Sequence, residues 1–351
     1  MSDDPPIRVR PIEVIVAVIS VLVVLYLLLP SPGTPREGSR RMQCGYNLKQ
    51  LALALQNYHD TFGRFPAGAE VRQSAATGDQ PTWGQSWIVA TLPFCEQAPL
   101  HDGLRKAEAQ GAEYVSPQLR QVADKVKLRY LLCPSSKLPE SEKLNGFQLF
   151  IPSYVGIMGA NELTTGPAAQ QVTEMKGPIV PGPYAGWAAS NGMLPINQRL
   201  KFADCTDGTA NTLIVAEVSA WYYDDRGRRQ NPALAFSGNS PATAGWLAGT
   251  NLTGTLGNDF MAVPADRVNN LVTVEHAINT NNKRGKSDAH PNWTTGGIGP
   301  RGLNNPLTSE HPAGAMAGFV DGHVQLLTKE TDPSVLKRLA IRDDGDLLLD
   351  Y

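Results

Sequence analysis

The sequence predicts an α+β protein: an N-terminal transmembrane helix, then a body in which a long helix packs on a mainly antiparallel β-sheet with long loops. Three observations support this prediction. An almost uninterrupted apolar run lies near the start of the chain. A second segment carries apolar residues at helical spacing. Beyond it, short apolar segments are separated by Asp-Gly dipeptides, which are typical of β-turns.

The apolar run covers residues 14–29, where Ser20 and Tyr26 alone carry a polar side-chain atom. As a helix it would rise about 24 Å, and its flanking residues bring it near the ~30 Å hydrocarbon thickness of a bilayer. No A-x-A-like cleavage site follows, which argues against a secretory signal peptide. The predicted parts of the chain are an N-terminal tail (1–11), a transmembrane helix (12–29), a Pro/Gly linker (30–41) and a body (42–351).

Glu13 lies at the N-terminal edge of the predicted span. A carboxylate there is costly unless it reaches the headgroup region or finds a partner. Two interpretations are open: Glu13 sits at the headgroup level without a role, or it neutralises the N-terminus of a neighbouring subunit. Arginines flank the span on both sides, so counting positive charges does not orient it.

The segment after the linker has apolar residues at 4-3-4-3-4 spacing, which predicts one continuous helical stripe. These residues are Cys44, Leu48, Leu51, Leu55, Tyr58 and Phe62. We expect Gly63 and Pro66 to end the helix. A stripe this narrow usually faces a core, so this helix is expected to pack on the sheet.

The C-terminal region predicts a hairpin followed by a short helix. Asp321-Gly322 separates two apolar segments, which indicates a type I′ turn with positive φ at both residues. His311 precedes the first strand, and nine residues of nearly extended chain keep it away from Asp321. We favour a His311 that hydrogen-bonds loop backbone over one with a catalytic or metal role. Asp332 and Pro333 predict the start of the helix.

Oxygen-bearing side chains near two further Asp-Gly turns are candidate calcium ligands. The first set is Asp204, Asp207 and Asn211, and the second is Asp343, Asp344 and Asp346. Neither set has the spacing of an EF-hand loop, and Asx turns explain such residues more often. We therefore expect no cofactor, with calcium as the weaker alternative.

Composition and missing motifs exclude several classes of function. The net charge is −2, so no basic field attracts nucleic acid. The four cysteines form no C-x-x-C pair, which argues against metal-finger and thioredoxin-like sites. The motifs G-x-S-x-G, H-E-x-x-H and G-x-x-x-x-G-K-[ST] are absent from the sequence, and its one G-x-G-x-x-G match, at residues 297–302, lies in an irregular Asn-, Gly- and Pro-rich stretch and does not follow a strand-like segment. We predict that the protein is not an enzyme.

Several blocks, in order along the chain, resemble a large bacterial family of unknown function. Members of that family have a prepilin-type N-terminus, similar to general secretion pathway protein G (the major pseudopilin), and a C-terminal signature of His, nine residues and Asp-Gly. Here the signature is His311 with Asp321 and Gly322. The other blocks are "RRMQCGYNLKQLALALQNYHDTFGRFPAG", "LPFCEQAPLHD", "LLCPSS", "FADCTDGTANTLIVAE" and "LAIRDDGDLLLDY".

The resemblance implies a pseudopilin-like body outside the cytoplasm, in the periplasm or at the cell surface, with residues 1–11 cytoplasmic. It implies a non-enzymatic structural or interaction protein of the cell envelope. The expected partners are the lipid bilayer, through residues 12–29, and other envelope or pseudopilin-like proteins. The alternative is an extracellular module that binds a glycan or a solute through its long loops.

The resemblance also suggests disulfide pairs for a body in an oxidising compartment. Cys44 and Cys133 fall in blocks where the family also has cysteine, so Cys44–Cys133 is the first expected bridge. Cys95–Cys205 is the second. Buried free thiols are the alternative for all four.

The N-terminus departs from the prepilin pattern. With Glu13 as the fifth mature residue, Val9 would be the first and Arg8 would replace the glycine before the cleavage site. We therefore expect an uncleaved anchor. The prolines of "PSPGTPREG" are expected to prevent the span and the following helix from acting as one rigid rod.

Overall fold

The computed structural model describes residues 10–28, 34–73, 81–160, 179–182, 186–223, 229–230, 245–252, 268–280 and 303–345. By its contacts the chain divides into two compact units, Met1–Ser39 and Arg40–Tyr351. Most of the fold belongs to the second unit, which is called the body below. The predicted strand after Asp344-Gly345 lies outside the described residues.

Helix α1 (Pro11–Leu28) forms where the apolar run predicts a helix. The Arg10 backbone N–H donates to Glu13 Oε2 at 3.2 Å, so this carboxylate caps the first turn. The large apolar side chains described between Ile12 and Val24 are all at least 50% exposed. Among the described residues, no helix combines the length and the apolar content that crossing a membrane requires. The span predicted over residues 12–29 is therefore not confirmed.

Helix α2 (Thr34–Phe62) buries five of the six residues of the predicted stripe, but Phe62 at its end is 59% exposed, and the helix starts earlier than expected. The predicted linker (30–41) is helical from Thr34, because proline is tolerated in the first turn of a helix and Glu37 complements the helix dipole there. The end agrees with the prediction: Gly63 has a φ of +70° and its N–H donates to the His59 carbonyl.

The central sheet of the body has five strands in the order β11-β5-β8-β12-β13. Their bounds are Leu271–Val274 (β11), Tyr154–Ala160 (β5), Leu213–Glu217 (β8), Gly314–Phe319 (β12) and Val324–Thr328 (β13). The β11–β5 pair is parallel and the other three pairs are antiparallel. The sheet is therefore mixed, and the parallel pair was not predicted.

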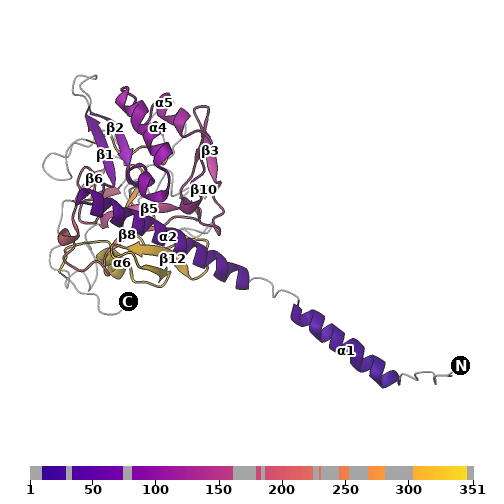
Figure 1. Ribbon diagram of the computed structural model, residues 1–351. Coiled ribbons are helices and arrows are strands. Elements are labelled where there is room, and N and C mark those ends of the chain that lie inside the picture. The colour runs from indigo at the N-terminus through magenta and orange to yellow at the C-terminus, as the bar shows by residue number, and fades with distance from the viewer. Residues whose placement is uncertain are drawn as a thin grey trace. The chain divides into compact units, whose positions relative to one another are not determined.

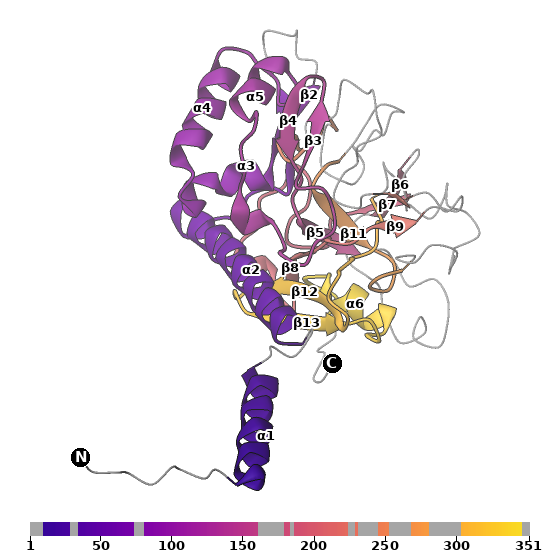
Figure 2. The ribbon, with the colours of Figure 1, turned by 90° about the vertical axis from the view of Figure 1, so that its right-hand side faces the viewer.

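Helices cover both faces of this sheet. Alternate residues of a strand point to opposite faces. Tyr154 and Met158 of β5 therefore join the core cluster that contains the α2 stripe, whereas Val155 and Ile157 join the cluster that contains α6 (Pro333–Leu339). Figure 1 and Figure 2 show α2 running along one side of the body, and in Figure 2 β12 lies between α2 and α6.

Smaller elements complete the body. The remaining helices are α3 (Trp87–Thr91), α4 (Ala98–Ala109), α5 (Pro117–Val122) and the 3₁₀ turns Leu92–Cys95, Arg129–Leu131 and Phe202–Asp204. Two-stranded sheets pair β1 (Ala69–Gln73) with β2 (Pro81–Ser86), β3 (Ser141–Leu144) with β4 (Phe147–Phe150), β6 (Ile179–Gly182) with β7 (Gly186–Ala189), and β9 (Tyr222–Tyr223) with β10 (Arg229–Gln230). Helices α4 and α5 pack together near β2 (Figure 2).

The C-terminal hairpin and helix form, but the predicted turn type is wrong. Gly322 has a φ of +89°, whereas Asp321 does not have positive φ. The Asp321 carboxylate instead accepts the backbone N–H of His323 at 2.9 Å, which favours a longer loop with glycine alone in the left-handed region. The predicted start of α6 is confirmed, because Asp332 Oδ1 accepts the Ser334 N–H at 2.7 Å.

The packing of α2 yields a matched pair of substitutions. Leu48 is fully buried against the sheet, whereas Leu53 of the same helix is 53% exposed. We expect Leu48→Ala to lower the free energy of unfolding by about 2–5 kcal/mol, because a cavity replaces a buried side chain. Leu53→Ala should change it by no more than about 0.5 kcal/mol. Urea unfolding of the full chain, followed by tryptophan fluorescence, measures both. Equal losses would contradict the assigned face of α2.

Candidate functional site

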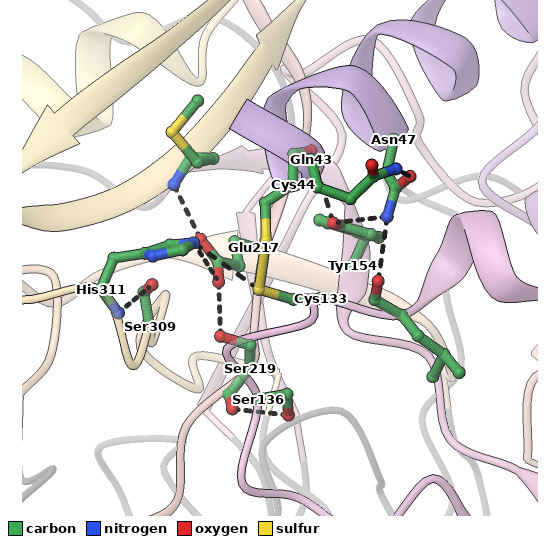
Figure 3. The surroundings of a disulfide bond; sticks show 12 residues. Gln43, Cys44, Asn47, Cys133, Ser136, Tyr154, Glu217, Ser219, Ser309 and His311 are labelled. Carbon is green, nitrogen blue, oxygen red and sulfur yellow. Dashed lines mark hydrogen bonds and ion pairs between the residues drawn. A yellow bond between two sulfur atoms is a disulfide. The ribbon is translucent and has the colours of Figure 1, made fainter. Parts of the chain in front are cut away.

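Four buried side chains from distant parts of the sequence meet beside the sheet. Cys44 comes from α2, Cys133 from the loop after Arg129–Leu131, Glu217 from the end of β8, and His311 from the loop before β12. One ligand-type atom from each lies within 4.8 Å of the other three. These four residues are called the buried cluster below, and Figure 3 shows them around the disulfide.

Cys44 and Cys133 form a disulfide whose Cα atoms are 5.3 Å apart. This is the first of the two pairs that the resemblance suggested. The bridge closes a sequence separation of 89 residues and joins α2 to the loop that follows Arg129–Leu131. A cross-link of this kind typically stabilises a fold by about 2–4 kcal/mol, mainly by restricting the unfolded chain.

His311 points its Nε2 atom at both the disulfide and the acid. The distances are 3.6 Å to Cys133 Sγ and 3.7 Å to Glu217 Oε1. Its backbone N–H donates to Ser309 Oγ at 3.0 Å, and the residue is 2% exposed. The main-chain N–H of His311 thus bonds a side chain of its own loop, whereas its imidazole, which we expected to bond loop backbone, faces a buried cluster that we did not expect.

The two halves of the His-x(9)-Asp-Gly signature have different partners. Asp321 contacts the ring of His323, with 2.6 Å between Oδ1 and Nδ1, at the tip of the hairpin. His311 instead faces Cys133 and Glu217 in the interior. The expectation that His311 and Asp321 lie apart is consistent with these partners, and each residue has its own structural task.

Glu217 is completely buried, and its carboxylate accepts hydrogen bonds from Ser219, Ser309 and Met316. Ser219 Oγ donates to Oε1 at 2.5 Å, and the Met316 backbone N–H donates to Oε2 at 3.0 Å. Burial raises the pKa of the Glu217 carboxyl above its ordinary value, while His311 and the hydrogen bonds oppose that rise. A buried acid with raised pKa beside a histidine is a feature often found at functional sites.

A polar network extends from the buried cluster along α2. The Tyr154 hydroxyl donates to the Cys44 carbonyl at 3.4 Å, and Asn47 Nδ2 donates to the Leu132 carbonyl at 2.9 Å. On the other side, Ser136 Oγ donates to the carbonyl of Ser219 at 2.8 Å (Figure 3). These bonds tie the Cys133 loop to the helix and to the segment that follows β8.

A cavity of about 530 Å³ lies next to Cys133. Its polar lining includes the side chains of Gln43, Asn47, Lys127, Arg129, Glu140 and Ser153. Lys127 Nζ lies 2.9 Å from Glu140 Oε2, so this cation already has an acidic partner. The mixture of amides and charged groups suits a polar ligand more than an apolar one.

The first predicted calcium set is engaged by backbone groups instead. Asp207 accepts the N–H groups of Asp344 and Gly345 at 2.6 and 2.9 Å, and Asp204 accepts the Lys201 N–H at 2.7 Å. Asn211 donates to the Asp207 carbonyl at 3.1 Å. Within the described residues, the group of histidine, cysteine and acidic side chains placed for a metal is the buried cluster. In the second predicted calcium set, Asp343 and Asp344 are among the described residues, whereas Asp346 lies outside them.

The second expected disulfide is not formed. Cys95 and Cys205 are free thiols with different neighbours: Cys205 Sγ donates to Thr212 Oγ1 at 3.2 Å, and Cys95 interacts with the hydroxyl of Tyr130. Burial raises the pKa of Cys95 to about 11 and also raises the pKa of Cys205. Both therefore stay protonated at neutral pH, which makes them poor nucleophiles.

Sequence reasoning missed Glu217, because a single acid carries no spacing pattern. One signal was available: Glu217 ends the apolar strand "LIVAE", where an acid without a partner would be costly. Aromatic side chains could stack on a glycan, but Trp87 and Trp246 are fully buried, and Trp87 Nε1 donates to the Asn270 carbonyl at 2.9 Å. These two tryptophans are core residues, whereas Trp293 lies outside the described residues.

The fold and the buried cluster define a class of α+β protein. Its long helix packs on a mixed sheet and is joined by a disulfide to the loop that contains Cys133, next to a buried His–Glu pair. A family model described as a protein of unknown function (DUF1559) matches residues 33–334. The chain belongs to this family. No curated protein and no solved structure matches the chain.

The cysteine assignments predict a definite thiol count. Protein isolated from cells, denatured without reductant and alkylated, should gain two alkyl groups, because Cys95 and Cys205 are free. Prior reduction should raise the gain to four. Intact-mass spectrometry measures both samples, and a Cys95→Ser variant, which should gain one group without reductant, is the control. Four alkyl groups without reductant would show that the Cys44–Cys133 bridge does not form in cells.

Proposed function

We propose that this chain is a membrane-anchored, pseudopilin-like structural or interaction protein of the cell envelope, without enzymatic activity. Residues 12–29 attach it to the lipid bilayer, and the body lies in the periplasm or at the cell surface. Its partners are other envelope or pseudopilin-like proteins. The observation that carries the proposal is the apolar surface of α1.

Helix α1 exposes apolar side chains in every direction. Val21, Leu22, Val23 and Val24 are each more than half exposed, and four consecutive residues point to different sides of a helix with 3.6 residues per turn. Exposing this much apolar surface to water is unfavourable at about 25 cal/mol per Å². A lipid environment removes that cost, which supports attachment to a bilayer.

The chemistry of the body supports a location outside the cytoplasm and a role without turnover. The Cys44–Cys133 disulfide is typical of oxidising compartments. His311 is 2% exposed and Glu217 is fully buried, so a large substrate has no access to them. The two free thiols are held protonated by burial.

The cavity beside Cys133 favours a second candidate, a binding module for an extracellular glycan or solute. Gln43 and Asn47 offer amide groups and Arg129 offers a cation along its wall. A ligand that binds the native state raises the melting temperature, so a thermal-shift screen of glycans and small polar solutes tests this candidate. Loss of the shift in an Arg129→Ala variant would place the ligand in this cavity, because Arg129 is an exposed residue of its wall.

Membrane attachment can be tested with matched variants of α1 and α2. Ile15, Ile19 and Leu22 of α1 are 54–58% exposed, and Met42, Tyr46 and Leu53 of α2 are 53–71% exposed. Lysine at the three α1 positions should move the protein from the membrane to the soluble fraction, because charge in the hydrocarbon region is costly. Lysine at the three α2 positions should leave it in the membrane. Immunoblots of fractionated cells measure both, and full-length wild-type chain in the soluble fraction would contradict the proposal.

The orientation and processing of the chain need a second measurement. Protease added outside spheroplasts should digest the body, while intact-mass analysis of the purified chain should show the original N-terminus. Protection of the body until the cells are lysed would place it in the cytoplasm instead. A processed chain that begins at Val9 would refute the uncleaved anchor.

A further inference from the structure

We propose that Cys44, Cys133, Glu217 and His311 form a zinc site when the disulfide is reduced. The inference goes beyond the proposed function and does not depend on membrane attachment. It assigns a second, metal-bound state to residues that form a disulfide in the oxidised chain.

The donor atoms match the preferences of zinc. Structural zinc sites have four ligands in a tetrahedron and are built from cysteine, histidine and carboxylate donors. The buried cluster offers two sulfurs, one imidazole nitrogen and one carboxylate oxygen, all within 4.8 Å of one another. The mixture of sulfur and nitrogen donors excludes a calcium or magnesium site, because those ions require oxygen ligands.

The distances also come close to those of a zinc site. With Zn–N and Zn–O bonds of about 2.0–2.2 Å and a Zn–S bond of about 2.3 Å, a tetrahedral site places a nitrogen about 3.5–3.6 Å from a sulfur and about 3.3–3.5 Å from an oxygen. His311 Nε2 lies 3.6 Å from Cys133 Sγ, which matches, and 3.7 Å from Glu217 Oε1, which is about 0.2–0.4 Å longer. The carboxylate therefore has to move slightly towards the imidazole, and the two sulfurs, now bonded to each other, have to separate.

The surroundings would hold the ligands in place. Ser219 Oγ and the Met316 N–H fix the carboxylate of Glu217, as supporting hydrogen bonds do around metal ligands. All four residues are at most 4% exposed, so a bound ion would be shielded from water and from competing ligands. A cation there would also offset the charge of the buried carboxylate.

The exchange between the two states is balanced. A dithiol reductant gives two electrons and two protons to the Cys44–Cys133 bond, which breaks, and the dithiol becomes a disulfide. The two thiols then release two protons to solvent when they bind Zn²⁺ as thiolates. Oxidation of the thiols by a disulfide would release the ion.

Metal titration of the full chain tests the proposal. The protein is reduced with dithiothreitol, desalted without oxygen, and titrated with Co²⁺ and then Zn²⁺. We expect one Co²⁺ per chain with a thiolate-to-metal absorption band that Zn²⁺ abolishes. Zn²⁺ should raise the melting temperature of the reduced chain and leave that of the oxidised chain unchanged, because a ligand stabilises only the state that binds it.

Variants identify the ligands. His311→Ala and Glu217→Gln should each weaken Co²⁺ binding at least about 10-fold, the loss seen even for supporting residues of metal sites. The control variants are Cys95→Ser with Cys205→Ser, and His323→Ala, which should bind as tightly as wild type. Folding of each variant is checked first in the oxidised form, where the disulfide remains. If either His311→Ala or Glu217→Gln does not fold, the Co²⁺ affinity of the other variant tests whether the buried cluster binds the metal.

Several results would overturn the proposal. One is a reduced chain that stays folded and shows no thiolate-to-metal band. Another is a reduced chain that unfolds and is not refolded by Zn²⁺. Unchanged affinity in the folded ligand variants, or loss of the band in the Cys95→Ser/Cys205→Ser control, would also exclude this site.

Discussion

Helix α2 buries one apolar stripe against the sheet, and the Cys44–Cys133 disulfide fixes one end of that stripe to the loop that contains Cys133. The packed face supplies most of the stability of such a helix, since isolated helices are marginal in water. The cross-link adds a constraint across 89 residues of sequence. Together they hold the Cys133 loop beside the end of β8, which brings Glu217 and His311 to the same place.

This arrangement places the polar side chains of the buried cluster inside an apolar core. Antiparallel pairing places the end of β8 beside the start of β12, so the Met316 N–H reaches the Glu217 carboxylate. Burying that carboxylate without partners would be costly. Ser219 and His311 reduce the cost, and the same contacts place an imidazole against the disulfide. The buried polar residues Glu217 and His311 therefore lie directly beside the Cys44–Cys133 disulfide.

Local patterns in the sequence predicted part of the local structure, but not the turn type at Asp321-Gly322 or the start of α2. The 4-3-4-3-4 spacing predicted α2 and its buried face, and Asp332 with Pro333 predicted the start of α6. The long-range features were not predictable in this way. The parallel pairing of β11 with β5 and the approach of Glu217 to His311 depend on how distant segments pack, which no periodicity encodes. The resemblance to a family suggested the Cys44–Cys133 pair, but spacing alone did not.

The arrangement of the body depends on the Cys44–Cys133 disulfide, which holds α2 in place beside the sheet. The most direct test compares the free energy of urea unfolding of the full chain before and after reduction, with a metal chelator in both samples so that no bound ion contributes. The account predicts that reduction lowers this free energy by about 2–4 kcal/mol, the usual contribution of a native cross-link. Equal free energies in the two samples would contradict it.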